Sequence, residues 1–448
     1  MSSKELKLII GLGVTGLSCL RYLSRQTHAV AVTDSREDPP GLAEARREFP
    51  NVKIVTGGFS PELIHEASEI IVSPGVALTH PLLLDAKARG VPIIGDIELF
   101  ARAATAPIIA ITGSNGKSTV TTLVGLMAEK AGLNVKVGGN LGTPVLEFLK
   151  EAEPDCYVLE LSSFQLDTTY SLKAAASVVL NVTPDHMDRY DSFEDYLKSK
   201  QHIYEGCQQA VINLDEPQIW QDLKFDHVPL GFSIKPNHPA ENLFSLVEEG
   251  QQFFFCFKQE KLLPVDEMKL KGKHNWQNAL AALALGSAIN LPMPAMLEVL
   301  KEFPGLPHRC QWVVNIQGVD WFNDSKGTNV GATQSALMGL GALLKGKKII
   351  LIAGGQGKNA DFSVLNPEIK NYVKQVVLLG EDAPLLAETW RNIAPLTQVS
   401  SLAEAVNKAA ELASSGDSVL LSPACASLDM FKNYEDRGEQ FVVLVKDL

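Results

Sequence analysis

Residues 108–119 read Ile-Ile-Ala-Ile-Thr-Gly-Ser-Asn-Gly-Lys-Ser-Thr and hold the strongest local signal in the chain. The apolar run at 108–111 predicts a buried strand, and the two glycines after it predict a tight turn. The following segment has apolar residues at helical spacing to about Ala131. Backbone N–H groups at such a strand–turn–helix junction converge on phosphate oxygens, and the helix dipole favours negative charge. The stretch therefore predicts a parallel α/β sheet with a phosphate-binding loop.

Individual side chains of this loop suit a nucleoside triphosphate and its metal ion. Lys117 is placed to reach the β- and γ-phosphates, and the hydroxyl of Ser118 or Thr119 can bind Mg²⁺. A strict Walker A motif would have glycine at Ile111, whereas the first glycine here is Gly113. The alternative is a structural turn with a solvent-facing lysine, which the flanking strand and helix disfavour.

Length and composition limit the classes of protein that fit. The chain has 448 residues, which at about 150 residues per domain corresponds to three domains. Hydrophobic residues make up 46% and charged residues 21%, which excludes a disordered protein. The formal net charge of −12 disfavours nucleic acid and acidic membranes as partners, because both attract a basic surface. An anionic ligand must therefore be held by a few local cations and backbone N–H groups.

The cysteines and the apolar runs indicate a cytosolic protein. The six cysteines are scattered, without the short paired spacings of metal sites, which favours reduced thiols. Residues 1–12 lack the long apolar region of a signal peptide. No apolar run reaches about 18 residues, so we expect no membrane span.

Short strands alternate with helical segments along most of the chain, which is typical of parallel α/β sheets. The expected strands are residues 6–10, 29–33, 70–73, 93–94, 108–112, 157–161, 177–182, 210–213, 348–353, 375–379 and 418–421. Residues 243–265 have a different pattern and predict a small antiparallel insertion, and the prolines and glycine of 303–308 predict a stiff linker. The predicted fold is α/β with three domains: a Rossmann-like domain at 1–99, a central mononucleotide-binding parallel-sheet domain at 100–305, and a Rossmann-like domain at 306–448.

Two candidate metal ligands follow expected strands of the middle domain. Glu160 ends one apolar run, and His186 follows the next within Asp185-His186-Met-Asp188. Open α/β sheets bind ligands at the carboxyl ends of their strands, and a hard cation beside a triphosphate needs such polar groups. Taken singly, Glu160 also suits a helix cap and His186 a surface position.

Lys200 lies on the apolar face of a helix expected at 193–204. A lysine there either extends its amine to water or is desolvated with a lowered pKa. A neutral amine can react with CO₂ to give a carbamate, which would act as an extra carboxylate. From periodicity alone, the solvent-reaching lysine is the better interpretation.

The N-terminal glycines support a rival hypothesis. Gly11-x-Gly13-x-x-Gly16 follows a strand, and Asp34 lies eighteen residues beyond Gly16, which fits the dinucleotide fingerprint of a dehydrogenase. The same turn serves any diphosphate, because it uses only backbone N–H groups and a helix dipole. Two phosphate loops on one chain fit two phosphorylated ligands better than one NAD(P). A regulatory module that binds ATP without turnover is a third class, and Lys117 with Glu160 and His186 speaks against it.

Several segments together resemble the Mur ligase family, the ATP-dependent amide-forming enzymes of peptidoglycan precursor assembly. The segments are 110–119, 138–140, 159–165, 181–188, 273–279, 306–309, 323–329 and 422–429, and they span the whole chain. The Asp-Asn-Pro-Arg motif of the diaminopimelate-adding members is absent, and 422–434 is similar to the pattern of members that add D-glutamate. Three residues depart from the common pattern: Ser114 for threonine, Gly327 for alanine and Tyr434 for phenylalanine.

The resemblance implies a role for each matching residue. The uridine diphosphate part of a substrate is expected at Thr15, Ser35, Arg36, Ser73, Asn140 and His186. ATP is expected at Gly113, Ser114, Asn115, Gly116, Lys117, Ser118, Thr119, Asn278, Arg309 and Asp324. D-glutamate is expected at Thr328, Lys358, Ser427, Leu428 and Tyr434. The expected metal ligands, for two Mg²⁺ ions, are Ser118, Glu160, His186 and a carbamylated Lys200. The expected catalytic residues are Lys117, Glu160, His186, Lys200 and Lys326.

The activity implied is ligation of D-glutamate to UDP-N-acetylmuramoyl-L-alanine through an acyl phosphate, with ATP converted to ADP and phosphate. The resemblance also reverses the periodicity-based interpretation of Lys200, because the matching lysine is carbamylated in the family. His186 is a metal ligand or a base towards the amine, and the residues leave both roles open. We expect a cytoplasmic monomer that binds small-molecule substrates, with no nucleic acid and no membrane segment.

Overall fold

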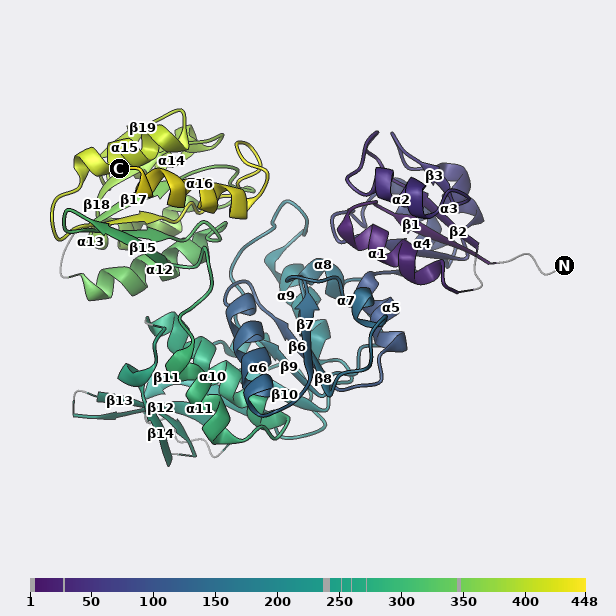
Figure 1. Ribbon diagram of the computed structural model, residues 1–448, viewed down its shortest axis with the longest axis horizontal. Helices are drawn as coiled ribbons and strands as arrows, with labels where there is room; N and C mark the ends of the chain where they lie inside the picture. Colours follow the sequence, from purple (N-terminus) through teal and green to yellow (C-terminus); the bar gives the residue numbers. More distant parts are fainter. Residues whose placement is uncertain are drawn as a thin grey trace.

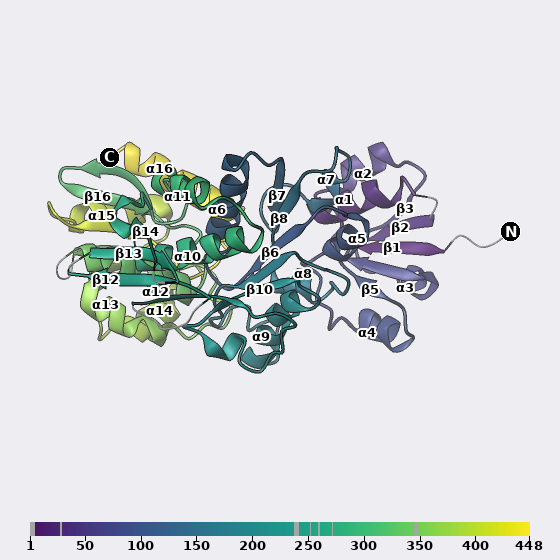
Figure 2. The same ribbon diagram turned by 90° about the horizontal axis from the view of Figure 1, so that it is seen from below.

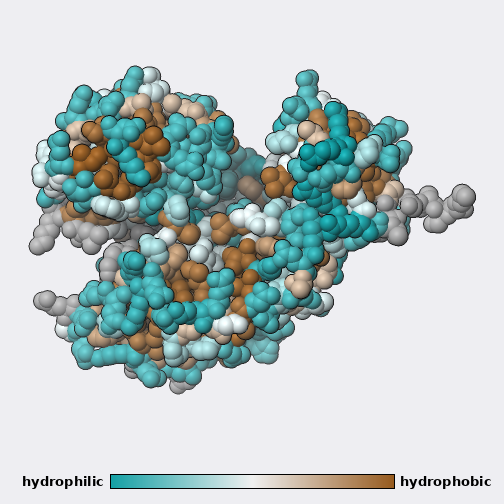
Figure 3. All heavy atoms as spheres, in the orientation of Figure 1, coloured by the Kyte–Doolittle hydropathy of each residue, from teal (hydrophilic) through white to brown (hydrophobic). Residues whose placement is uncertain are grey.

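The computed structural model describes residues 5–26, 29–236, 242–250, 252–258, 260–270, 272–344 and 348–448. Three sheets, each packed against helices, follow one another along the chain (Figure 1). On the face drawn in Figure 3, the molecule is hollowed between the lobes built on the first and third sheets. Among the described residues, no helix has both the length and the apolar character needed to cross a membrane.

The first sheet is parallel and has the strand order β3-β2-β1-β4-β5. Its strands are β1 (Leu6–Ile10), β2 (Ala29–Thr33), β3 (Lys53–Val55), β4 (Glu69–Val72) and β5 (Ile93–Ile94). Its helices are α1 (Val14–Leu23), α2 (Leu42–Glu48), α3 (Pro61–Glu66) and α4 (Pro81–Ala88). Gly16 has no room for a Cβ, because the carbonyl oxygen of Gly11 occupies that space. The glycine therefore lets α1 begin close against the end of β1.

The second sheet has nine strands in the order β14-β13-β12-β11-β10-β9-β6-β8-β7. They are β6 (Ile108–Thr112), β7 (Val135–Gly139), β8 (Cys156–Glu160), β9 (Ala176–Val179), β10 (Gln209–Asn213), β11 (Leu230–Pro236), β12 (Leu243–Glu249), β13 (Gln252–Phe257) and β14 (Glu260–Pro264). The antiparallel strands β12 to β14 continue this sheet, because β12 pairs in parallel with β11. The helices are α5 (Asp96–Ala103), α6 (Lys117–Lys130), α7 (Val145–Phe148), α8 (Ser163–Leu166), α9 (Phe193–Gln201), α10 (Lys273–Ala288) and α11 (Met293–Glu302).

The third sheet has the order β15-β16-β20-β17-β18-β19 and is parallel except for the β15–β16 hairpin. Its strands are β15 (Gln311–Ile316), β16 (Val319–Asn323), β17 (Ile349–Ala353), β18 (Val373–Leu378), β19 (Leu396–Gln398) and β20 (Ser418–Leu421). Its helices are α12 (Val330–Leu343), α13 (Asn366–Tyr372), α14 (Ala383–Trp390), α15 (Leu402–Leu412) and α16 (Tyr434–Lys446). Short 3₁₀ turns lie at His202–Tyr204, Pro217–Ile219, Val265–Glu267 and Phe362–Leu365.

The predicted α/β class with three parallel-sheet units is confirmed, and most predicted strands begin and end within two residues of the observed ones. The strand expected at 177–182 is the exception, because β9 ends at Val179. Beyond it, the side chain of Asn181 binds the phosphate loop. The segment 303–308 connects α11 to β15, between the second and third sheets. The exact domain boundaries stay predictions.

The first two units share one apolar core, whereas the third has its own. Leu20 of α1, Phe100 of α5 and Tyr157 of β8 belong to a single buried cluster, and the rings of Phe100 and Tyr157 meet edge to face at 4.9 Å. Figure 2 shows α5 at the junction of the two sheets. The two faces of the third sheet are covered by separate clusters, which contain Trp390 and Trp321. The first two units are therefore joined by apolar packing, which the third unit does not share.

Candidate active site

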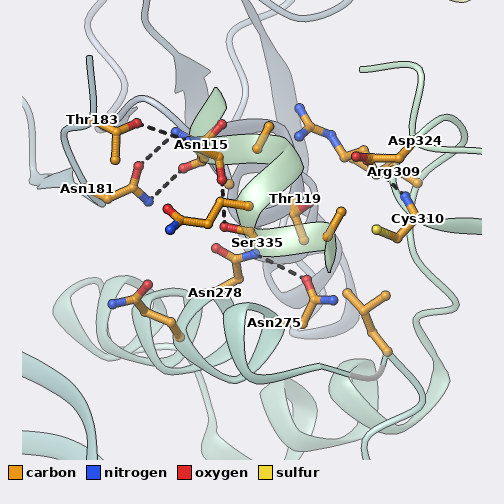
Figure 4. A pocket seen from close by; sticks show the side chains of 18 of the residues that line it. Asn115, Thr119, Asn181, Thr183, Asn275, Asn278, Arg309, Cys310, Asp324 and Ser335 are labelled. Atoms are coloured by element: carbon orange, nitrogen blue, oxygen red, sulfur yellow. Dashed lines mark hydrogen bonds between the residues drawn. The ribbon is translucent and has the colours of Figure 1, made fainter. Parts of the chain in front are cut away.

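The phosphate loop has the strand–turn–helix geometry that its sequence predicts. It begins at Gly113 and reaches α6 through Gly116, whose φ of 83° is in the region that favours glycine. A Cβ at Gly116 would collide with the side-chain oxygen of Asn278. Asn181 fixes the loop from the other side, accepting a hydrogen bond from the Asn115 N–H (2.8 Å) and donating to its carbonyl (3.0 Å), as Figure 4 shows.

Two buried lysine amines meet at this loop. Lys117 donates to the carbonyl oxygens of Gly113 (2.8 Å) and Ser114 (3.0 Å), and Lys200 donates to the same Gly113 oxygen at 3.0 Å. Burial lowers the pKa of Lys117, although Glu160 raises it in part. Burial lowers the pKa of Lys200 well below its usual value, and the charge of Lys117 adds to this effect. Two amines that donate to one carbonyl create a site that an anion would stabilise.

Lys200 does not extend its amine to water. Its side chain is 2% exposed, and its amine lies 4.6 Å from the ring centroid of Tyr196. The interpretation from periodicity alone, that this lysine reaches solvent, is therefore wrong. The helix face is buried more deeply than its pattern shows, because the phosphate loop packs over it. The depressed pKa favours the neutral amine that carbamate formation requires.

Glu160 lies at the end of β8 with one oxygen free. Its Oε1 accepts a hydrogen bond from Asn140 at 2.9 Å, whereas its buried Oε2 has no hydrogen-bond partner in the described part of the chain. Burial alone would raise the pKa of Glu160, but the charge of Lys117, together with the nearby Ser118 hydroxyl and the Asn140 amide, holds the pKa below its usual value. The group is therefore an ionised carboxylate with an unused acceptor, which suits a cation.

His186 is neutral and constrained at this site. Its backbone φ is 58°, in the left-handed region, and its ring meets Phe164 edge to face at 4.9 Å. Burial lowers the pKa of His186 to about 4, despite the nearby charge of Asp185. A neutral imidazole suits metal ligation.

The expected metal ligands do not form a complete metal site by themselves. Across the described ranges, no three His, Cys, Asp or Glu side chains are grouped closely enough to hold an ion. The free oxygen of Glu160 and the buried Lys200, once carbamylated, nevertheless fit an ion whose other ligands come from phosphates and water.

A cavity of about 190 Å³ lies between the phosphate loop, α10 and α12 (Figure 4). Its wall contains six of the residues expected to bind ATP: Asn115, Gly116, Thr119, Asn278, Arg309 and Asp324. Gly113, Ser114, Lys117 and Ser118 belong to the same loop without lining this cavity. Arg309 crosses from the third unit and donates a hydrogen bond to the Ser118 hydroxyl at 2.7 Å. Burial raises the pKa of Asp324 to about 6.

A larger cavity of about 720 Å³ separates the first sheet from the second. Five of the residues expected at the uridine diphosphate line it, namely Thr15, Ser35, Arg36, Ser73 and Asn140, whereas His186 does not. Asp34 accepts a hydrogen bond from the Leu12 N–H and forms a two-pronged pair with Arg36. Both Asp34 oxygens are therefore engaged, so this acid is not free for the ribose contact that a dehydrogenase would need.

The residues expected at D-glutamate are only partly brought together. Thr328 and Lys358 line a cavity of about 290 Å³ with His186, whereas Ser427, Leu428 and Tyr434 lie outside its wall. Lys326 lies with its amine 3.6 Å from the ring centroid of Tyr434, and burial lowers the pKa of Lys326 to about 8.

Sequence reasoning gave no role to Asn329 or Arg437, and it quoted Asp185 only as part of the segment 185–188. Asp185 accepts hydrogen bonds from Lys358 (2.9 Å) and Asn329 (3.0 Å), and so links the middle unit to the third. Asp185 and Asn329 lie inside segments that the family resemblance picked out, so position in those segments was a usable signal. Arg437 is buried and donates to the carbonyls of Ser325 (2.8 Å) and Cys425 (3.3 Å), thereby supporting two site loops. No pattern in the sequence pointed to Arg437.

Comparison with known proteins agrees with this geometry. The family described as "Mur ligase MurD-like, N-terminal domain" matches residues 5–95, "Mur ligase middle domain" matches 111–286, and "Mur ligase, glutamate ligase domain" matches 308–425. The chain belongs to the Mur ligase family.

Relatives of known name cover the whole chain. A protein of Coxiella burnetii (strain Dugway 5J108-111) named UDP-N-acetylmuramoylalanine–D-glutamate ligase is 53% identical over 448 residues, which is 100% of each chain. A Pseudomonas aeruginosa protein of the same name is 52% identical and covers 100% of this chain and 99% of its own. Among solved structures, the Mur ligase UDP-N-acetylmuramate-alanine ligase MurC from Thermotoga maritima matches with a TM-score of 0.63 at 17% identity, covering 99% of this chain and 100% of its own. The last match shows the shared fold.

The buried environment of His186 generates a test. Because burial lowers its pKa to about 4, we expect its ring resonances not to titrate between about pH 5.5 and 8 in NMR spectra of histidine-labelled protein. His186→Gln assigns the signal by removing it. A titration midpoint near about 6.5, the ordinary value for histidine, would contradict the described environment.

Proposed function

We propose that this chain is the ligase that joins D-glutamate to UDP-N-acetylmuramoyl-L-alanine at the expense of ATP. The observation that carries the proposal is the convergence of Lys117 and Lys200 on one carbonyl of the phosphate loop, beside the free oxygen of Glu160. This arrangement provides positive charge for a transferred phosphoryl group and a ligand for its metal. The relatives that match over the whole chain, at 53% and 52% sequence identity, are named for this activity.

The reaction proceeds in two steps. A carboxylate oxygen of UDP-N-acetylmuramoyl-L-alanine attacks the γ-phosphorus of ATP, and ADP leaves. The D-glutamate amine then attacks the carbonyl carbon of the acyl phosphate, phosphate leaves, and the new amide loses a proton. The first step depends mainly on positioning and charge neutralisation, as in phosphoryl transfer generally.

The chain's own residues divide these tasks. Lys117 neutralises the γ-phosphate, while Asn278, Arg309 and Asp324 hold the nucleotide from the cavity wall. Lys326 stabilises charge at the reacting carbonyl, and its lowered pKa reflects the exclusion of water there. Mg²⁺ would be held by Ser118, Glu160, His186 and carbamylated Lys200, and would supply charge neutralisation at the phosphates. With a pKa of about 4, His186 is a weak base near neutral pH, which favours ligation over proton removal as its role.

The two other substrates bind at different units of the chain. The uridine diphosphate lies in the cavity between the first two sheets, at Thr15, Ser35, Arg36, Ser73 and Asn140. D-glutamate lies in the cavity between the middle and third units, at Thr328 and Lys358. Ser427, Leu428 and Tyr434 would contribute from other loops of the same third unit. We further propose that the protein acts as a monomer. ATP and the UDP-linked precursor place the reaction in the cytoplasm, as a step of cell-wall synthesis needed for growth and division.

Formation of ADP tests the proposal. Wild-type protein should release ADP with UDP-N-acetylmuramoyl-L-alanine and D-glutamate together, and ligated product should accumulate in equal amount. Lys117→Ala should lower turnover by at least about a hundredfold, because it removes charge that the transition state needs. Lys130→Ala, at the opposite and more exposed end of α6, is the matched control and should keep wild-type turnover. Wild-type turnover in Lys117→Ala would contradict the assignment of the phosphate loop.

The carbamate on Lys200 has its own test. Lys200→Ala should lose most activity and regain part of it with added short carboxylates such as acetate or formate, which occupy the space of the carbamate. Lys198→Ala is the control, because this exposed lysine of the same helix pairs only with Glu194 in the described structure. Full activity of Lys200→Ala without any added carboxylate would show that no carbamate is required.

A further inference from the structure

Arg189 connects the middle unit to the first one. It follows His186 in the loop after β9, and its guanidinium donates to the carbonyl oxygens of Gly75 (3.3 Å) and Val76 (3.2 Å). The same guanidinium lies over the ring of Phe164, 4.5 Å from the ring centroid. The side chain is thus held on one side by an aromatic face and bonded on the other to the backbone of another unit.

The two carbonyls belong to the wall of the large cavity. Ser73, Gly75 and Val76 line it from the first unit, and Asn140 and Gln165 line it from the second. A Cβ at Gly75 would meet no atom within 4 Å, so little packs against this turn at that point. The hydrogen bonds from Arg189 therefore tie this turn of the first unit to the middle unit.

The aromatic support of Arg189 also reaches His186. The Phe164 ring meets His186 edge to face at 4.9 Å and stacks on Tyr190 with centroids 5.9 Å apart. The Tyr190 hydroxyl donates to Asp167 at 2.8 Å, which anchors the stack. Phe164 belongs to α8, whose N-terminus is fixed by a capping box between Ser162 and Gln165. One cluster thus fixes the guanidinium, the His186 ring and the second wall of the cavity.

We propose that Arg189 is a positioning residue that sets the separation of the two walls of the substrate cavity. It acts through the carbonyls of Gly75 and Val76 and through the Phe164 ring, without touching the substrate. The inference rests on the proposed function, in which the substrate is gripped at its uridine diphosphate end by the first unit and presents its carboxylate to the middle unit. If the walls separate, the first unit still binds the uridine diphosphate, but the substrate carboxylate is displaced from the phosphate loop. Displacements of about 1 Å can lower a rate by about a hundredfold.

The test compares two ligands on the same variants. Arg189→Met removes both hydrogen bonds, and Arg189→Lys keeps the charge without the planar fork. Affinity is measured by calorimetry, without ATP, for UDP alone and for UDP-N-acetylmuramoyl-L-alanine. Arg189→Met should weaken binding of the full substrate by about tenfold or more and lower kcat, while affinity for UDP and the KM for ATP stay within about twofold. Arg189→Lys should fall between Arg189→Met and wild type.

Arg89 provides a matched control. It too donates to two consecutive carbonyls, of Ile64 (3.1 Å) and His65 (3.3 Å), but all three residues belong to the first unit and none lines the cavity. Arg89→Met should leave both affinities unchanged. Phe164→Leu removes the ring beneath the guanidinium. It should also weaken binding of the full substrate while leaving the affinity for UDP unchanged, and it replaces Arg189→Met in the test if that variant fails to fold.

Two outcomes would overturn the proposal. If Arg189→Met weakened the binding of UDP and of the full substrate equally, Arg189 would be needed for the folding of the first unit. If both affinities were unchanged, its contacts would not position the substrate. Failure of the proposed function is seen separately, as wild-type protein that binds UDP but forms no ADP with the complete set of substrates.

Discussion

The burial of two amines against one backbone carbonyl is the constraint on which the site depends. Lys117 and Lys200 both donate to Gly113, and burial lowers the pKa of each. The charge of Lys117 lowers the pKa of Lys200 further, whereas the carboxylates of Asp185 and Glu160 act in the opposite sense on both lysines. Phosphate oxygens at Lys117 and a carbamate at Lys200 would relieve this imbalance. The proposed chemistry therefore follows from an electrostatic need that the fold itself creates.

The way the three units are joined suits a reaction with three substrates. An apolar core continues from the first unit into the second, and the cavity expected to hold the uridine diphosphate lies between these two units. The third unit meets the second through polar contacts, in which Arg309 binds Ser118 and Lys358 binds Asp185. Polar interfaces of this kind permit relative motion more readily than apolar ones. Three of these residues, Arg309, Ser118 and Lys358, are expected to bind ligands, so ligand binding and the position of the third unit would be coupled.

Features that depend on local pattern were predictable from the sequence. The phosphate loop follows from an apolar strand, two glycines and a helix, and the walls of the large cavity follow from strand ends of parallel sheets. Contacts between distant segments were not predictable, because no periodicity relates Asp185 to Lys358 or Arg189 to Gly75. The depth of Lys200 was misjudged for the same reason, since the loop that covers it lies 87 residues earlier in the chain. The residues expected around D-glutamate all belong to the third unit, but only Thr328 and Lys358 line the cavity, which no local pattern in the sequence could distinguish.

A crystal structure with a non-hydrolysable ATP analogue and UDP-N-acetylmuramoyl-L-alanine tests the central claim most directly. The account predicts the terminal phosphate within the loop at residues 113–119, with the Lys117 amine turned from the Gly113 carbonyl onto a phosphate oxygen and the substrate carboxylate facing the γ-phosphorus. An empty loop with the adenine nucleotide bound elsewhere would contradict it.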